Sequence, residues 1–337
     1  MSIVYLKSIN QHINFKQYDK IVVFFSGGKD SVDTVLSLFE KGIKPAQIEL
    51  HHHLIDGDNK EFFMDWQCTE SYCREFAKAF GLELYFSWKV GGFEGEMLRN
   101  NDFTGNKAVP DENGNMIIVE SSKNERYKNT RLKYPQVSPD LSVRYCSSYL
   151  KIDIGDLAVR KRFDFNGDKK YLVVSGERAE ESPNRAKYLS FEKYRADNRN
   201  GKSAKRYIDH LRIAHQDTEV EVWERMKRWK VNPHPAYHIG LGRTSCKFCI
   251  FANEDQWATL REYDPSGFQK VLNYEKQFNL SINRDGSFID KIADKGKIFD
   301  VPEGYFDIAN STEYREPIIV DSWTLPLGAF KVIGGAI

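Results

Sequence analysis

The chain has 337 residues, of which 41% are hydrophobic and 29% charged, and its 49 lysines and arginines nearly balance 48 aspartates and glutamates. This composition is typical of a globular protein with a buried core, and the charge balance argues against a histone-like or general DNA-coating protein. No apolar run approaches the roughly 18 residues of a membrane span, and the N-terminal stretch lacks the apolar core of a secretion signal. We therefore expect a cytoplasmic protein without a membrane partner.

Strand and helix patterns alternate in the first half of the chain. Apolar runs predict buried strands at 20–25, 47–55 and 82–87, and periodic apolar positions predict helices at 31–40 and 64–80. This β-α-β-α-β order favours an α/β fold: a doubly wound, mostly parallel five-stranded sheet with helices on both faces.

The second half of the chain is less regular. We expect a polar lid or insertion at 101–143, a helix at 147–162, a strand at 170–175, a helix at 217–230 and a small mixed appendage after 285. The expected domains are an α/β domain over residues 1–215 and a C-terminal helical, cysteine-bearing module over 216–337.

The first strand runs into a glycine-rich stretch that opens the first helix. It consists of Ser26, Gly27, Gly28, Lys29, Asp30 and Ser31. Adjacent glycines allow close approach and positive φ, and the amides and dipole of a helix N-terminus favour an anion. The serine hydroxyls and the lysine charge add donors, and the aspartate either helps to hold Mg²⁺ or caps the helix. The spacing is neither that of the Walker loop nor that of the dinucleotide folds, and the pattern predicts a phosphate-binding loop rather than a simple helix cap.

This SGGKDS stretch resembles the PP-loop of the N-type ATP pyrophosphatases, also called adenine nucleotide α-hydrolases. The resemblance implies that the loop grips the β- and γ-phosphates of ATP, while attack on the α-phosphate transfers AMP and releases pyrophosphate. It also implies the α/β nucleotide-binding fold of that superfamily for residues 1–215.

Two further stretches resemble the phosphoadenosine phosphosulfate (PAPS) reductase-like branch of this superfamily. GERAEESPNR, residues 176–185, fits its Gly-x-Arg-x-x-Glu-Ser-x-x-Arg pattern, and RYCSSYLK, residues 144–151, is similar to its Arg-x-Cys…Lys segment. With the stretch RYIDHLRIAHQDTEVEVWERM, the resemblance covers residues 20–260.

The chain departs from the PAPS reductases proper in two places. Its loop keeps the Lys-Asp pair that is degenerate in those enzymes, and no cysteine follows Cys249 to attack a sulfonate. It therefore looks more like the ATP-using relatives, which are the small subunit of ATP sulfurylase and the ATP pyrophosphatases of DNA phosphorothioation and tRNA thiolation.

The resemblance and the chemistry together define candidate site residues. Arg178 and Arg185 follow a buried strand, at the edge where parallel sheets place ligands, and would stabilise charge on pyrophosphate. The alternative is surface ion pairing with Glu180 and Glu181. The expected catalytic residues are Lys29, Asp30, Arg178 and Arg185, and ATP is expected to contact Ser26, Gly27, Gly28, Lys29, Asp30, Ser31, Asp56, Gly57, Gly176 and Arg178.

Three consecutive histidines, His51 to His53, end the second strand. Alternation along a strand sends His51 and His53 to one face and His52 to the other, so we expect packing and hydrogen bonding rather than a shared metal ion. The resemblance places Asp56 and Gly57, just beyond them, at the border of the adenosine.

A C-x-x-C loop provides the strongest metal signal. Cys246 and Cys249 have the spacing of two ligands to one metal, Cys146 is a candidate third, and His238 or His234 a candidate fourth. Three cysteines and one histidine suit structural zinc, and three cysteines with an open position suit a 4Fe-4S cluster. A redox dithiol or no metal remains the alternative.

Residues 185–214 carry nine Lys or Arg against three acids, with aromatic residues interleaved. Such a segment either binds single-stranded nucleic acid or closes over the phosphates of ATP.

The sequence thus predicts an enzyme that uses ATP and Mg²⁺ to adenylate an acceptor, in sulfur transfer to a nucleic acid or in sulfate activation. The alternatives are a PAPS or adenylyl sulfate reductase and a non-catalytic ATP-sensing subunit. Candidate partners are a nucleic acid, a sulfur-carrier protein, a regulatory or ParB-like protein and a second copy of the chain.

Overall fold

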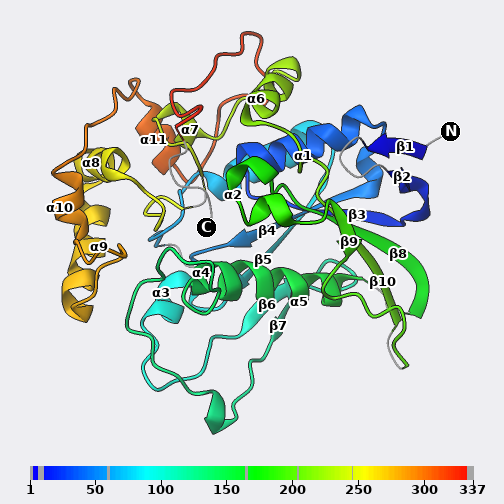
Figure 1. Cartoon of the computed structure of the whole chain (residues 1–337), viewed down its shortest axis with the longest axis horizontal. Helices are drawn as coiled ribbons and strands as arrows, with labels where there is room; N and C mark the ends of the chain where they lie inside the picture. Colours follow the sequence, from blue (N-terminus) through cyan, green and yellow to red (C-terminus); the bar gives the residue numbers. More distant parts are fainter. Residues whose placement is uncertain are drawn as a thin grey trace.

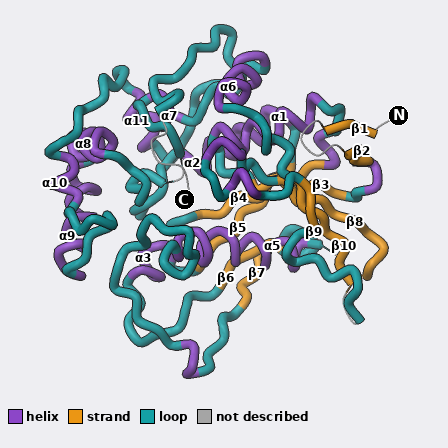
Figure 2. Tube along the Cα trace, in the orientation of Figure 1, coloured by secondary structure: helices purple, strands orange, loops and turns teal. Residues whose placement is uncertain are grey.

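The structure is a computed structural model that describes residues 3–6, 11–58, 61–163, 166–202, 205–244 and 246–331. In this part of the chain, one eight-stranded sheet has the strand order β7-β6-β5-β4-β3-β8-β10-β9, and β1 pairs with β2 in a separate hairpin (Figures 1 and 2). The strands are β1 (Ile3–Leu6), β2 (Gln11–Asn14), β3 (Lys20–Phe24), β4 (Ile48–Leu54), β5 (Glu83–Lys89), β6 (Lys107–Pro110), β7 (Met116–Val119), β8 (Asn166–Val174), β9 (Phe191–Lys193) and β10 (Lys205–Leu211).

The centre of the sheet is parallel. β5, β4, β3, β8 and β10 run in one direction, whereas β6 and β7 add antiparallel strands at one edge and β9 at the other. The doubly wound, mostly parallel α/β fold expected from the sequence is therefore confirmed. The expected five strands correspond to the parallel centre, and the complete sheet is wider.

Helices cover both faces of this sheet (Figure 1). They are α1 (Lys29–Glu40), α2 (Thr69–Phe80), α3 (Gly92–Met97), α4 (Tyr145–Ser147), α5 (Asp153–Arg162), α6 (Glu219–Arg228), α7 (Pro235–His238), α8 (Glu254–Tyr263), α9 (Pro265–Phe278), α10 (Ile289–Ala293) and α11 (Tyr305–Asn310). On one face, Val23 of β3 packs in a common core with Val35 of α1 and Trp223 of α6. On the other face, Val22 of β3 shares a core with Val159 of α5. Alternate residues of β3 thus serve the two faces, as strand geometry requires.

The C-terminal helices form a second region beside the sheet. Trp257 of α8, Phe268 of α9 and Ile289 of α10 pack in one core with Phe93 of α3. The expected C-terminal module corresponds to α6 to α11 in the described part of the chain, with the short helices α10 and α11 after residue 285. Its boundary with the α/β region, placed near residue 215, stays a prediction, because α6 packs directly on α1.

The structure corrects three local predictions. The helix expected over 64–80 begins at Thr69, because the amides of residues 63–65 bind the carboxylate of Asp56 instead. The segment 101–143 contains the β6–β7 hairpin, which extends the sheet. The basic segment 185–214 contains two strands, β9 and β10.

The strand order reverses between β3 and β8. From β3 the chain builds outward through β4 to β5, and it then returns to β8 and β10 on the other side of β3. The carboxyl ends of β3 and β8 therefore flank a topological switch point, where open α/β sheets bind their ligands. The SGGKDS loop follows β3 and the GER stretch of residues 176–178 follows β8, so two segments singled out from the sequence meet at this point.

Candidate functional site

The SGGKDS loop connects β3 to α1 through a tight turn. Gly27 has φ of +76°, a conformation that favours glycine. A Cβ on Gly28 would lie 2.7 Å from Oγ1 of Thr244, so this position also has no room for a side chain. The hydroxyl of Ser31 donates to the carbonyl of Gly28 at 2.8 Å, and the Gly28 amide donates to Oγ of Ser26 at 3.3 Å. The loop is thus held by its own serines.

Lys29 lies at the start of α1 and is only 3% exposed. Its Nζ donates to the carbonyl of Gly242 at 3.2 Å and lies 3.7 Å from carboxylate oxygens of Asp30 and Glu219, while its amide donates to the hydroxyl of Tyr237 at 2.9 Å. Burial alone would lower the pKa of Lys29, but the nearby negative charges raise it above its ordinary value. The lysine is therefore a charged group held by neighbours from α6 and the loop after α7.

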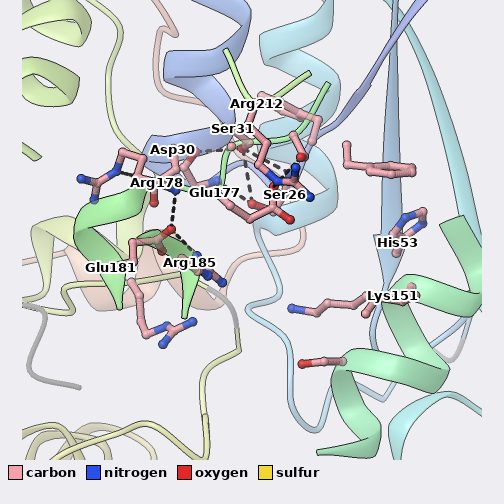
Figure 3. A pocket seen from close by; sticks show the side chains of 18 of the residues that line it. Ser26, Asp30, Ser31, His53, Lys151, Glu177, Arg178, Glu181, Arg185 and Arg212 are labelled. Carbon is pink, nitrogen blue, oxygen red and sulfur yellow. Dashed lines mark hydrogen bonds and ion pairs between the residues drawn. The ribbon is translucent and has the colours of Figure 1, made fainter. Parts of the chain in front are cut away.

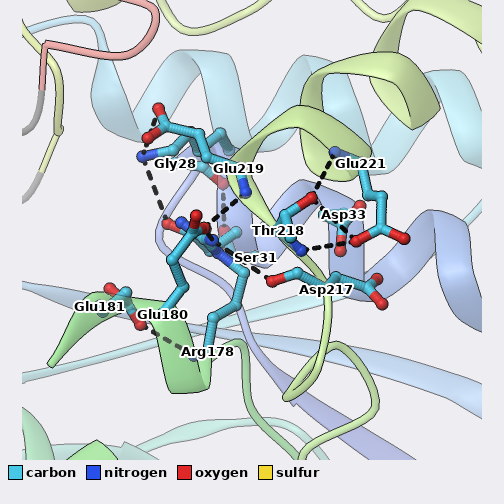
Figure 4. Close-up of polar contacts among 12 residues, drawn as sticks. Gly28, Ser31, Asp33, Arg178, Glu180, Glu181, Asp217, Thr218, Glu219 and Glu221 are labelled. Carbon is cyan, nitrogen blue, oxygen red and sulfur yellow. Dashed lines mark hydrogen bonds and ion pairs between the residues drawn. The ribbon is translucent and has the colours of Figure 1, made fainter. Parts of the chain in front are cut away.

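Arg178 joins the loop after β8 to the loop after β3. Its Nε donates to Asp30 Oδ1 at 2.7 Å (Figure 3), and its Nη1 donates to Glu180 at 2.6 Å (Figure 4). Burial would raise the pKa of Asp30, but the charges of Lys29 and Arg178 lower it, so this carboxylate is ionised. Gly176 permits the approach, since a Cβ there would lie 2.7 Å from the carbonyl oxygen of Asp30.

The two candidate arginines do form the ion pairs that the sequence offered as their alternative role. Arg178 binds Glu180 and Arg185 binds Glu181. Arg178 is nevertheless only 3% exposed and also binds Asp30, so it is not a surface ion pair.

A cavity of about 1200 Å³ opens at the switch point. From the SGGKDS loop it is lined by Ser26, Gly28, Lys29, Asp30 and Ser31, and from the segment after β8 by Gly176, Arg178 and Arg185. Figure 3 shows Ser26, Asp30 and Ser31 close to Glu177, Arg178, Glu181 and Arg185, with His53 and Lys151 on another side of the pocket. The fold thus brings together most of the candidate residues for ATP and catalysis.

Further residues line the cavity beyond those expected to contact ATP or to act in catalysis. Tyr237 and Thr244 touch the SGGKDS loop, and Arg243 and Arg144 line the same cavity. Nε and Nη1 of Arg144 are buried without a hydrogen-bond partner among the described residues, and burial, together with the charges of two neighbouring arginines, lowers its pKa. The only signal for Tyr237, Arg243 and Thr244 was their place near the C-x-x-C loop, which we had interpreted as a metal centre.

Asp56 and Gly57 lie outside this cavity, beside a neighbouring one of about 320 Å³. The Asp56 carboxylate accepts the amides of Phe63, Met64 and Asp65 at 2.8–2.9 Å, and thereby stabilises the loop before α2. Contact of these two residues with a nucleotide stays a prediction.

The histidines of β4 alternate as expected. The rings of His51 and His53 lie on the α5 face near Phe163 and Phe24, whereas Nδ1 of His52 lies 2.8 Å from the carbonyl of Phe25 on the α2 face. All three rings pack as predicted and His52 and His53 also form hydrogen bonds, whereas neither ring nitrogen of His51 has a hydrogen-bond partner among the described residues.

The predicted metal centre is not assembled. Within the residues that the structure describes, no three His, Cys, Asp or Glu side chains are grouped so that they could hold a metal ion. Burial raises the pKa of the Cys146 and Cys246 thiols, and Cys249 contributes in the same direction. As placed here, Cys146, Cys246, Cys249 and His238 do not fit zinc or a 4Fe-4S cluster.

Both candidate histidine ligands have other partners. Nε2 of His238 lies 3.1 Å from Asn232 Oδ1, and its ring stacks on Tyr305 at 4.6 Å. Nδ1 of His234 accepts the amide of Ala236 at 3.2 Å and so caps α7. The C-x-x-C spacing indicated a shared ion, but it did not determine where the fourth side chain lies.

Several arginines of the basic segment form ion pairs within the protein. Arg199 binds Asp197 and Asp209, and Arg212 binds Glu192 at 2.7 Å. Binding of a nucleic acid by this segment stays a prediction.

The fold and this site define a doubly wound α/β protein with a glycine-rich strand–turn–helix loop at its switch point. No protein-family model and no curated protein sequence matches the chain. Among solved structures it is similar to FMN adenylyltransferase of Candida glabrata in complex with FMN and an ATP analogue, with 14% identity, 69% of this chain and 57% of that chain covered, and a TM-score of 0.33. For the same enzyme in complex with ATP, the identity is 12%, the alignment covers 69% of this chain and 55% of that chain, and the TM-score is 0.35.

A second kind of structure is also similar. The U34-tRNA thiolase NcsA of Methanococcus maripaludis, with its 4Fe-4S cluster, has 14% identity, 77% of this chain and 72% of that chain covered, and a TM-score of 0.33. The chain spans little more than half the length of the adenylyltransferase. At these values the similarities carry no argument about activity, and the fold stands on the topology described above.

No helix in the described part of the chain combines the length and the apolar character needed to cross a bilayer.

Proposed function

We propose that the protein binds ATP at the SGGKDS loop and transfers its adenylyl group to an acceptor, with release of pyrophosphate. The observation that carries this proposal is the ion pair between Asp30 and Arg178, which joins the loop after β3 to the loop after β8 inside one cavity. A glycine-rich turn at a helix N-terminus supplies donors for phosphate, and an adjacent arginine supplies charge where the leaving group develops it.

The positive groups of the site are positioned for a polyanion. Lys29, Arg178 and Arg185 line one cavity and are each balanced by a carboxylate: Glu219, Asp30 and Glu181. A triphosphate would compete with these carboxylates for the same cations. Because the acids are paired with basic side chains, Mg²⁺ is expected to bind mainly through phosphate oxygens, as it commonly does in nucleotide sites.

The acceptor is the finer part of the proposal. The resemblance to PAPS reductase-like proteins supports a link to sulfur transfer or sulfate activation, with a nucleic acid, a sulfur carrier or sulfate as the acceptor. Reduction of a nucleotide sulfate is the weaker alternative, since no cysteine follows Cys249 in the sequence.

A second candidate is an ATP-sensing subunit without turnover. It is favoured by one observation: Lys29 is only 3% exposed, and both its amide and its Nζ already have protein partners. In a sensor, ATP would displace these partners and change the contacts of Tyr237 and Gly242 without chemistry.

Pyrophosphate release from ATP with Mg²⁺ tests the proposal, measured for the wild type, Lys29→Met and, as the control, Lys78→Met. Lys78 lies on α2 with its side chain 78% exposed. We expect the control to match the wild type and Lys29→Met to lose about 100-fold or more in rate, the scale for one transition-state charge contact. Binding of ATP by the wild type without any pyrophosphate release would favour the sensor. Absence of ATP binding would refute both candidates.

A further inference from the structure

Glu177 lies in the same cavity between two residues that contact the SGGKDS loop. Its neighbours Gly176 and Arg178 touch Asp30, the first by close backbone approach and the second by an ion pair. The backbone of Glu177 is thereby fixed against the start of α1. Figure 3 shows its side chain beside Ser26, Ser31 and Arg212.

The Glu177 carboxylate is held by a short chain of hydrogen bonds. Oγ of Ser175 donates to Glu177 Oε2, and Nε2 of His210 lies 2.6 Å from the same Ser175 Oγ. A hydroxyl has one proton, so when Ser175 donates to the carboxylate its oxygen accepts the Nε2–H of His210. Ser175 is 7% exposed and His210 is 9% exposed, so the chain is shielded from water.

Arg212 does not complete the binding of this carboxylate. Its Nε lies 3.5 Å from Glu177 Oε2 and has no hydrogen-bond partner among the described residues. Its Nη1 donates instead to Glu192 at 2.7 Å and to the carbonyl of Leu189 at 2.6 Å. In the described part of the chain Glu177 Oε1 has no hydrogen-bond or ion-pair partner, and the side chain remains 31% exposed at the cavity.

The charges around Glu177 keep it ionised. Burial would raise its pKa, but the guanidinium charges of Arg212 and Arg185 and the hydrogen bond from Ser175 lower it. His210 itself is neutral near pH 7, because burial lowers its pKa to about 4. The cavity therefore contains a carboxylate that is negatively charged, oriented through one oxygen and open to a ligand at the other.

We propose that Glu177 is the proton acceptor for an acceptor molecule that attacks as a neutral hydroxyl or amine. The proposal rests on the adenylyl transfer proposed above. The nucleophilic oxygen or nitrogen forms a bond to the α-phosphorus, the bond from that phosphorus to the bridging oxygen breaks, and pyrophosphate leaves with the electron pair. The proton of the nucleophile passes to Glu177 Oε1, and Ser175 and His210 act as positioning residues.

This assignment favours one class of acceptor over another. A hydroxyl or amine must lose a proton as it becomes bonded to phosphorus, and a positioned carboxylate within the site accelerates such steps by about 100-fold to 10,000-fold. An oxyanion such as sulfate has no proton to lose. It would also meet the negative charge of Glu177, which disfavours its approach.

The test uses ATP labelled at the α-phosphate with three probes: water, hydroxylamine and sulfate. We expect the wild type to transfer AMP to water and hydroxylamine and not to sulfate. Glu177→Gln, which is nearly isosteric, should lose at least about 100-fold of that rate while binding a non-hydrolysable ATP analogue within about twofold of the wild type. Glu177→Asp should recover part of the rate.

The pH profile separates catalysis from a structural role. The wild-type rate should fall on the acid side as Glu177 becomes protonated, and this limb should be absent from Glu177→Gln. Ser175→Ala removes a hydrogen bond that lowers the pKa of Glu177, so the acid limb should move to higher pH.

Two results would overturn the inference alone: an unchanged rate in Glu177→Gln while Lys29→Met is inactive, or a wild type that adenylates sulfate but neither water nor hydroxylamine. A wild type that binds no ATP, or binds it and reacts with none of the probes, overturns the inference together with the catalytic proposal.

Discussion

Two loops of this protein carry sequence motifs that predict a binding site, and they differ in how their surroundings are arranged in the structure. SGGKDS, between β3 and α1, has its glycines, serines and lysine arranged around one end of the sheet. The C-x-x-C loop of Cys246 and Cys249 lies after α7; Cys146 lies near enough to influence the pKa of Cys246, but no group that could hold a metal ion forms among the described residues.

The difference lies in what each motif needs. A phosphate loop is built by a strand end, a turn and a helix start that are consecutive in the chain. A metal centre needs side chains from distant segments, and its geometry is set by tertiary packing as much as by spacing. Local motifs therefore predict local sites, and the first loop becomes a candidate site only where it meets the segment after β8.

Removing the contact between the SGGKDS loop and the segment after β8 should have the largest effect. Arg178→Met removes the guanidinium that binds Asp30 at 2.7 Å. We expect pyrophosphate release to fall by about 100-fold to 1000-fold, because charge at the leaving group is no longer stabilised. Steady-state kinetics measure this, with Arg74→Met on the exposed surface of α2 as the control. Equal rates for the two variants would mean that the loop works without its partner.

The histidine upstream of the cysteines should affect stability through pH. His234 is 0% exposed, and burial lowers its pKa to about 3. Below the unfolded-state pKa near 6.5 the unfolded chain takes up a proton that the folded state does not, so stability falls as the pH drops from about 7 to 4. This site alone should account for about 3 kcal/mol of that loss.

The variant His234→Asn keeps a capping side chain at the start of α7 and removes the titration. Denaturant unfolding between pH 4 and 7 should show that the free energy of unfolding depends less on pH in this variant than in the wild type. The same pH dependence in both proteins would contradict the statement that His234 is neutral in the folded state.

The two loops lie so close together that there is no room for a methyl group at Gly176. A Cβ there would lie 2.7 Å from the carbonyl oxygen of Asp30, which belongs to the helix backbone and cannot rotate away. We expect Gly176→Ala to cost about 1–3 kcal/mol of stability and to weaken ATP binding. Gly95→Ala in α3 meets nothing within 4 Å and serves as the matched control. Calorimetric titration with an ATP analogue and thermal unfolding measure the two effects. Equal affinity and equal stability of the two variants would show that position 176 has room for a methyl group.

The cysteine loop should give the smallest effect. Cys246→Ser is expected to change the free energy of unfolding by less than about 1 kcal/mol, because no metal-binding group forms around it in the described structure. Purification under nitrogen, an absorption spectrum and metal analysis provide the check. A stoichiometric metal in the wild type, lost together with several kcal/mol of stability in the variant, would show that the cysteines converge when an ion is present.

Part of the fold could be predicted because β3 and the end of β8 are short apolar runs, IVVF and YLVV. β3, β4 and β5 lie within two residues of their expected ends. β10, with the sequence KRYIDHL, was not predicted as a strand, because the sequence interpretation of 185–214 rested on its basic charge. The hydroxyl of Tyr18 donates to Asp209 in β10 at 2.7 Å across 191 residues of sequence, and no local pattern reports such a partner.

The site divides in the same way. Ser26 to Ser31, Gly176 and Arg178 were foreseen because each lies within a motif of consecutive residues. Tyr237, Thr244 and the Ser175–His210 pair were not, since their roles arise only after strands and loops distant in sequence have packed together.

The placement of the phosphate loop on β3 and of Glu177 and His210 on the neighbouring β8 and β10 side has a practical consequence for redesign. The loop expected to bind ATP and the residues expected to activate the acceptor lie in separate segments of the sequence. Substitutions at positions 175, 177 and 210 would therefore probe how the acceptor is activated and leave the sequence of the SGGKDS turn unchanged.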